Sequence, residues 1–163
     1  MAHFIWLTDP HFNFLTKSKL IEFFLYLESL RPDGIFISGD ISTGPKVIQH
    51  LQYLEKIINK PIYFVLGNHD YYRSSFSEIN QSISSINNKN LIYLSHSNTP
   101  IELSNDTCLI GHDGFYDLGW LIPKYPTVFS LDWLCIRELR NIYSISELYK
   151  YFHKNCVSLT SSC

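Results

Sequence analysis

Short runs of apolar residues alternate, along the first part of the chain, with longer segments in which apolar residues recur every three or four positions. The runs Phe4–Leu7, Ile35–Ser38 and Ile62–Leu66 are almost continuously apolar, which is typical of strands covered on both faces. The segments between them, at about 17–30 and 45–58, carry apolar residues at helical spacing. Because parallel strands need crossover connections, this order predicts parallel strands joined right-handedly by helices.

The pattern changes in the second half of the chain. Ser75–Glu78 fits a capping box that opens another amphipathic helix, and residues 91–94 form a further apolar run. Residues 100–103 and 107–110 flank a Ser-Asn-Asp turn, which predicts a hairpin added antiparallel to the sheet. Apolar spacing predicts one more helix at 131–139. The fold class is therefore α/β with a mixed sheet.

Composition favours a single globular domain over residues 1–163, because 45% of the residues are hydrophobic and 15% are aromatic. The formal net charge of -2 provides no basic field for tracking along nucleic acid, so a small substrate is the simpler expectation. We expect no signal peptide, because residues 1–7 lack the basic segment and long apolar region of one, and no apolar run is long enough to span a bilayer. The four cysteines lack a paired C-x-x-C spacing, which favours reduced thiols in a cytoplasmic protein.

Polar side chains suited to metal binding follow each of the first three predicted strands. Asp9 and His11, two residues apart, follow the first strand, and Asp40 follows the second. The third strand runs into the tetrapeptide Gly67-Asn68-His69-Asp70. Open α/β sheets bind ligands at the carboxyl ends of their strands, and carboxylate, amide oxygen and imidazole groups bind divalent metals. These clusters predict a metal-dependent site at one edge of the sheet.

The ordered set D-x-H, G-D and G-N-H-[DE] resembles the leading motifs of the calcineurin-like metallophosphoesterases, over roughly the first 70 residues. The resemblance implies an α/β/β/α sandwich and a pair of divalent ions, such as Mn, Fe or Zn, that clamp a phosphoryl group. It also implies a role for each matching residue. Asp9 and His11 would bind the first metal, Asp40 would bridge both, Asn68 would bind the second, His69 would contact or protonate the substrate, and Asp70 would orient His69.

The chain departs from the family after these motifs. The family's later histidine and its G-H-x-H motif are absent, so the first metal keeps three side chains and the second keeps only Asp40 and Asn68. We therefore expect a C-terminally truncated sandwich that holds at most one ion tightly. An apolar sheet face left uncovered favours self-association. His112 and Asp113 lie in a loop (111–117) similar to one in some members and are candidate substrate-binding residues, although an ordinary polar loop explains them equally well.

Two functions of different classes follow from these observations. A metal-dependent phosphoesterase would hydrolyse a phosphomonoester or phosphodiester through a dinuclear metal site. The alternative is a truncated metal- or phosphate-binding module with weak or no turnover, because the second site has lost its histidines. A nucleotide-binding domain of the Rossmann type is disfavoured, since no G-x-G-x-x-G follows any predicted strand.

Overall fold

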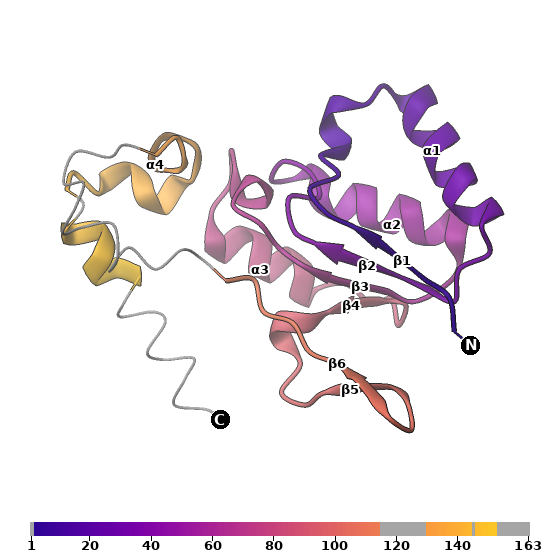
Figure 1. The fold of residues 1–163 in the computed structure, drawn as a ribbon. Coiled ribbons are helices and arrows are strands. Elements are labelled where there is room, and N and C mark those ends of the chain that lie inside the picture. The colour runs from indigo at the N-terminus through magenta and orange to yellow at the C-terminus, as the bar shows by residue number, and fades with distance from the viewer. Residues whose placement is uncertain (1, 115–129, 145, 153–163) are drawn as a thin grey trace.

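The computed structural model describes residues 2–114, 130–144 and 146–152. Strands alternate with helices through β4 and are followed by a hairpin and a short helical region (Figure 1). The bounds of the elements are β1 Phe4–Leu7, η1 Phe12–Phe14, α1 Lys17–Ser29, β2 Gly34–Ser38, α2 Lys46–Ile58, β3 Ile62–Val65, η2 His69–Tyr71, α3 Phe76–Ser84, β4 Leu91–Tyr93, η3 Leu94–His96, β5 Ile101–Ser104, β6 Thr107–Leu109, α4 Asp132–Cys135 and η4 Arg137–Asn141. The strands and helices predicted before residue 95 are all present.

The first four strands form one parallel sheet in the order β1-β2-β3-β4. The register pairs Leu7 with Ile37 and Ile37 with Phe64, which brings the carboxyl ends of β1, β2 and β3 to one edge. Right-handed crossovers between strands in unreversed order place every helix on the same face of the sheet. Accordingly, α1, α2 and α3 cover one face (Figure 1).

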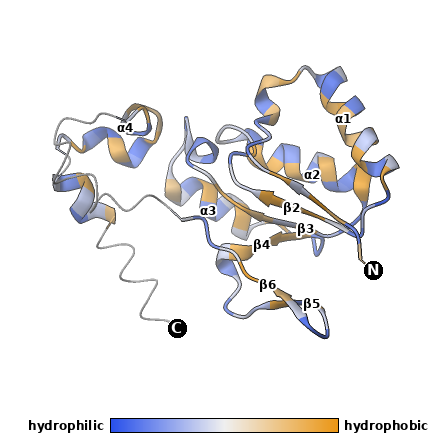
Figure 2. Ribbon diagram, in the orientation of Figure 1, coloured by the Kyte–Doolittle hydropathy of each residue, from blue (hydrophilic) through white to orange (hydrophobic). Residues whose placement is uncertain are grey.

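The helices bury the apolar faces that their spacing predicts. The stripe on α2 is fully buried and consists of Val47, Leu51, Leu54 and Ile58. The side-chain oxygen of Thr16 caps α1 by accepting from the amide of Lys19, and that of Ser75 caps α3 by accepting from the amide of Glu78. Figure 2 shows hydrophobic strands in the centre and helices that alternate between hydrophobic and hydrophilic faces. The core therefore lies between the three helices and one face of the sheet.

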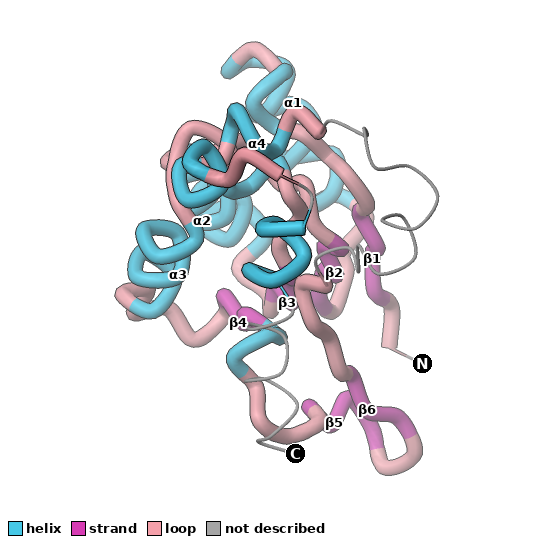
Figure 3. The backbone as a smooth tube through the Cα atoms, turned by 90° about the vertical axis from the view of Figure 1, so that its left-hand side faces the viewer, coloured by secondary structure: helices cyan, strands magenta, loops and turns pink. Residues whose placement is uncertain are grey.

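The hairpin differs in one respect from the prediction. Within the described residues, β5 and β6 form a separate two-stranded antiparallel sheet rather than an extension of the parallel one (Figure 3). The short helix η3 follows β4 directly and turns the chain away before β5 begins. The α/β fold class is confirmed, with the parallel and antiparallel strands divided between two sheets.

The sheet face opposite the helices carries aromatic side chains. Trp6, Phe36 and Tyr63 are neighbours across β1, β2 and β3, and Trp6 is 73% exposed. The segment after β6 crosses part of this face, where Ile110 and these aromatic residues line a depression of about 280 Å³. The expectation of self-association rests on this surface.

Residues 130–144 and 146–152 dock beside α3. The amide of Arg73 donates to the carbonyl oxygen of Cys135 (2.8 Å), and the amide of Arg137 donates to that of Ser74 (2.9 Å). The predicted helix at 131–139 is divided into α4 and η4, because Ile136 between them has extended backbone angles. No helix in the described ranges is both long and apolar enough to cross a membrane.

Candidate metal centre

Backbone hydrogen bonds join the turn after β1 to the turn after β2. The amide of His11 donates to the carbonyl oxygen of Asp40 (3.0 Å), and the amide of Phe12 donates to that of Ile41 (2.9 Å). Phe12 is 1% exposed and anchors the first turn in the core. The two turns are therefore held in a fixed relation by groups that do not depend on a ligand.

Left-handed backbone angles are concentrated in these turns. Asp9, His11 and Asp40 have φ values of 47°, 42° and 49°, although none of them is glycine. Such a conformation costs about 1–2 kcal/mol per non-glycine residue and occurs preferentially where function requires it. Three strained residues at one sheet edge mark this edge as the candidate site.

Two glycines let the turns after β2 and β3 approach each other closely. A Cβ atom at Gly67 would lie 2.0 Å from Oδ1 of Asp40, and one at Gly39 would lie 2.9 Å from the nitrogen of Gly67. Gly39 also has a φ of +93°, which side-chain-bearing residues rarely adopt. The glycines in the sequence motifs are thus explained by the space that Asp40 and its turn need.

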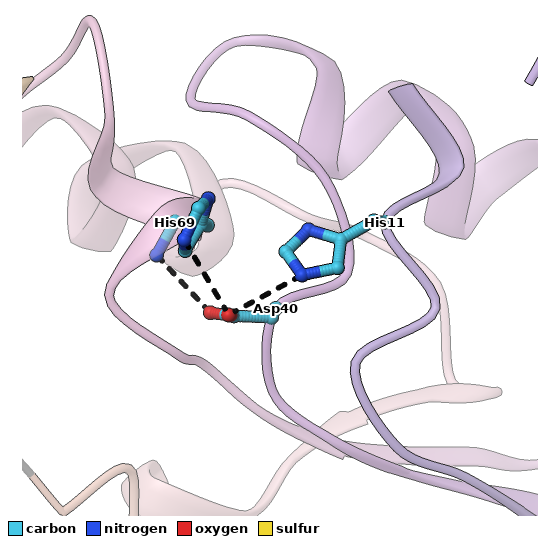
Figure 4. Close-up of side chains that lie close together, drawn as sticks. All are labelled: His11, Asp40 and His69. Carbon is cyan, nitrogen blue, oxygen red and sulfur yellow. Dashed lines mark hydrogen bonds and ion pairs between the residues drawn. The ribbon is translucent and has the colours of Figure 1, made fainter. Parts of the chain in front are cut away.

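His11, Asp40 and His69 form a compact cluster at the carboxyl edge of the sheet (Figure 4). Oδ2 of Asp40 lies 3.6 Å from Nε2 of His11 and 4.0 Å from Nε2 of His69, and both rings point towards it. The ligand atoms of the three residues all lie within 4.8 Å of one another. Oδ1 of Asp40 accepts from the amide of His69 (3.1 Å), which fixes the carboxylate.

The cluster has the chemistry of a divalent-metal site. It combines two imidazoles with one carboxylate, a donor set that suits Zn, Fe or Mn. The Asp40 side chain is only 13% exposed, and its ion-pair partners within the described ranges are both histidines rather than lysine or arginine. A neutral imidazole leaves the negative charge of Asp40 available to a cation. His11 and Asp40 therefore fit a bound metal ion, and His69 lies close enough to contact the ion or a group bound to it.

Two predicted ligands lie outside this three-residue cluster. Asp9 is exposed, and its Oδ2 accepts from the hydroxyl of its neighbour Thr8 (2.8 Å). Asn68 directs Nδ2 towards Asp132 and Tyr72, at 2.8 and 3.2 Å. His69, predicted to contact the substrate, lies beside the candidate ligands His11 and Asp40, and its ring stacks on Tyr72 with centroids 4.3 Å apart. The structure thus brings together only part of the predicted set.

Asp70 is placed differently from its predicted role beside the ring of His69. Its two carboxylate oxygens accept from the backbone amides of Ser42 (2.8 Å) and Gly67 (2.9 Å), so it ties the turn after β2 to the turn after β3. Asp70 is fully buried, and burial raises its pKa to about 7, against the opposing effect of these amides. Because both oxygens are engaged by backbone, Asp70 supports the shape of the site.

The carboxylate of Asp113 is also engaged within the protein. Its oxygens accept from the amide of Leu66 (2.8 Å) and from the hydroxyls of Ser95 (2.7 Å), Tyr71 (3.1 Å) and Tyr93. These contacts hold the 111–114 segment against the end of β3, and the substrate-binding role of Asp113 stays a prediction. His112 is exposed, and its Nδ1 accepts from the amide of Gly114 (3.1 Å). Residues 115–117 of the same loop lie outside the described residues.

One residue at this edge was missed by the sequence analysis. Asp132 is 2% exposed, and its Oδ1 accepts from both Asn68 and Tyr72. The available signal was an acidic residue at the start of an otherwise apolar segment, which also suits a helix terminus. Nothing in the local spacing connects it with Asn68, which lies 64 residues earlier.

A family model for calcineurin-like phosphoesterases matches residues 2–157. The chain belongs to the calcineurin-like phosphoesterase family, as the order of its strand-end motifs indicated. No curated protein matches the chain.

A solved structure has a similar fold. The chain resembles the crystal structure of the phosphopantetheinyl hydrolase PptH from Mycobacterium tuberculosis with a TM-score of 0.64 and 15% sequence identity. The similarity covers 98% of this chain but 62% of that one. The chain thus spans less than two thirds of the length of PptH, and at this identity the likeness concerns the fold alone.

Proposed function

We propose that this chain is a metal-dependent phosphoesterase that hydrolyses a phosphomonoester or phosphodiester. The observation that carries the proposal is the cluster of His11, Asp40 and His69 at the carboxyl edge of the sheet, on turns whose sequence matches the family's motifs. A family match alone would be compatible with a degenerate chain. The cluster adds ligand atoms of His11 and Asp40 that suit a divalent ion, with the ring of His69 beside them, which is the chemical requirement of the reaction.

A divalent ion in this cluster supplies Lewis acidity towards a phosphoryl oxygen and towards water. His11 and Asp40 hold the position, and their backbone amide and carbonyl groups are already joined by a hydrogen bond. Oδ1 of Asp40 is fixed by the amide of His69, so the carboxylate needs little rearrangement when it binds a cation. This preorganisation is what makes electrostatic stabilisation effective in a transition state.

His69 is suited to act on the leaving group. Its side chain is 36% exposed, so a substrate can reach the ring, and stacking on Tyr72 restricts the ring's orientation. A proton held on the imidazole is donated to the departing oxygen, which avoids release of an alkoxide. Nε2 of His69 lies 4.0 Å from Oδ2 of Asp40, so the ring stands beside the position that the ion would take.

The number of bound ions follows from the ligand count. We expect one tightly held ion, of Mn, Fe or Zn, at His11 and Asp40 and a weaker second ion that uses Asn68. Asp9 would need a rotation away from Thr8 to become a ligand. Positions filled by water compete poorly with imidazole for a transition metal. Metal analysis of the purified protein tests this, and two tightly held ions per chain would contradict it.

Other features support narrower proposals about the cellular compartment, the substrate class and the oligomeric state. Cys108 and Cys135 are free thiols, as expected in a reducing compartment such as the cytoplasm. The absence of a strong net charge favours a small phosphorylated substrate over nucleic acid. The exposed Trp6 on the open sheet face favours self-association. Sedimentation of the wild type against Trp6→Ser tests this last point, because a dimer that uses the face should dissociate in the variant.

A binding module without turnover is the second candidate. The observation that favours it is the sparse ligand set of the described residues, since Oδ2 of Asp9 accepts from Thr8 and Nδ2 of Asn68 faces Asp132. The deciding experiment assays p-nitrophenyl phosphate and its bis ester with added Mn²⁺. Turnover that Asp40→Ala abolishes and Asp106→Ala preserves supports the phosphoesterase, since Asp106 is an exposed acid in the hairpin turn. Tight Mn²⁺ binding without turnover on either substrate would establish the module.

A further inference from the structure

The side-chain amide of Asn68 has a defined orientation. An asparagine side chain has an NH₂ group with two donors and one oxygen that only accepts. The NH₂ group of Asn68 faces this pair of acceptors, since Nδ2 lies 2.8 Å from Oδ1 of Asp132 and 3.2 Å from the hydroxyl of Tyr72. The amide oxygen is then the atom that remains to meet a ligand.

Asp132 determines this orientation because an ionised carboxylate can only accept. The side chain is 2% exposed, and Oδ2 accepts from the hydroxyl of Ser130 (2.8 Å) while Oδ1 accepts from Tyr72. Turning the Asn68 amide over would place its oxygen against this buried carboxylate, with a large electrostatic cost. The orientation is therefore imposed by chemistry as well as by packing.

The segment that carries Asp132 is fixed to the site-bearing turn by independent contacts. The Arg73 amide donates to Cys135, and the amide of Ser77 donates to Oε1 of Glu138 (3.1 Å). Ile136 is completely buried in the core. Asp132 is thus held in place whether or not Asn68 is present.

We propose that Asp132 is a positioning residue that orients the Asn68 amide so that its oxygen serves a divalent ion beside Asp40. The inference rests on the metal centre of the proposed function. Donation from Nδ2 to a carboxylate also increases the electron density on the amide oxygen and so strengthens it as a ligand. The 130–141 segment thereby contributes to the second metal position without supplying a ligand itself.

Calorimetric titration of the metal-free full chain with Mn²⁺ tests this. Asp132→Ala should weaken the lower-affinity ion by about 10–100-fold, the usual effect of removing a group that orients a ligand, and leave the tighter ion unchanged. Asp132→Asn keeps an accepting oxygen and should lose less. Glu138→Ala is the matched control, because Glu138 anchors the same segment through Ser77 and does not touch Asn68; its Mn²⁺ affinities should equal those of the wild type.

A double-mutant cycle separates orientation of Asn68 from general stabilisation. In an Asn68→Ala background, Asp132→Ala should cause no further loss of Mn²⁺ affinity, because the amide on which Asp132 acts is gone. The inference would be overturned if Asp132→Ala lowered the Mn²⁺ affinity equally in the wild-type and Asn68→Ala backgrounds. It would also be overturned if Asp132→Ala alone kept the Mn²⁺ affinity of the wild type. If Asp132→Ala does not unfold cooperatively, Asp132→Leu takes its place in the cycle under the same criteria, because it also removes both accepting oxygens.

The outcomes also distinguish this inference from the proposed function. If the cycle shows that Asp132 and Asn68 are coupled in Mn²⁺ binding but the wild type has no turnover, the phosphoesterase is refuted and the role of Asp132 stands. Turnover with a second ion insensitive to Asp132, or with a single ion at saturating Mn²⁺, would refute the role of Asp132 and keep the phosphoesterase. A wild-type chain that binds no Mn²⁺ would refute both.

Discussion

Gly67→Ala should damage the candidate metal centre more than any other single-methyl addition at a glycine of the described chain. An added Cβ would lie 2.0 Å from Oδ1 of Asp40, 2.8 Å from its Cγ and 2.6 Å from its backbone nitrogen. Ordinary van der Waals contact begins at about 3.4 Å, so Asp40 must move by roughly 1 Å or more. Since backbone is among the clashing atoms, a change of side-chain rotamer is not sufficient.

The displacement has two measurable consequences. Inserting a methyl group into a closely packed region costs about 1–3 kcal/mol, so the free energy of unfolding of the metal-free protein should fall by this amount. Misplacing a catalytic group by about 1 Å can cost about 10²-fold, and a comparable loss of turnover is expected because Asp40 leaves the two histidines. Mn²⁺ affinity should fall in parallel, since Asp40 is the ligand that moves.

Urea unfolding and Mn²⁺ titration of the same preparations provide the assay. Gly114→Ala is the matched control, because its φ of +54° makes the substitution strained, while the nearest atom to its Cβ among the described residues outside its chain neighbours is 4.0 Å away. The control should lose stability and keep the Mn²⁺ affinity of the wild type. Wild-type Mn²⁺ affinity in Gly67→Ala would refute the reasoning, since Asp40 would then be able to move without consequence for the site.

Three further predictions concern individual side chains. His69→Ala should lower turnover by about 10²–10⁴-fold, less on p-nitrophenyl phosphate than on an alkyl ester, and keep Mn²⁺ affinity nearly unchanged; loss of the ion as complete as in Asp40→Ala would make His69 a ligand. Burial, and to a smaller extent the charge of Lys46, lowers the pKa of His50 below 6.5 in the folded chain. The unfolded chain therefore binds the proton more readily, and the free energy of unfolding falls as the pH drops below that value. In urea unfolding at about pH 7.5 and about pH 5.5, His50→Gln should therefore lose less stability on acidification than the wild type, and equal losses would contradict this. Asp113→Ala should destabilise the fold by about 2–4 kcal/mol in urea unfolding, because it leaves an amide and several hydroxyls without an acceptor; a change confined to KM would restore its substrate-binding role.

The sequence by itself determined the parallel sheet and the edge at which the site lies. Local periodicity distinguishes strands from helices, and right-handed crossovers leave few alternatives for how successive strands pair. Each motif follows a strand directly, so the placement of His11, Asp40 and His69 at one edge follows from connectivity alone. The capping of α3 by Ser75 was equally predictable, because donor and acceptor lie three residues apart.

The roles of the acidic residues were decided only by tertiary structure. Asp70 accepts from the amide of Ser42, 28 residues away, Asp113 from Leu66 at 47 residues, and Asp132 from Asn68 at 64 residues. A carboxylate has the same local signature whether it binds a metal, a substrate or a backbone amide. Which donors reach it depends on how separate turns meet in space, and periodicity does not encode that relation. The same reason applies to the hairpin, whose sequence predicts the pairing of β5 with β6, while only packing after η3 decides that the pair stands apart from the parallel sheet.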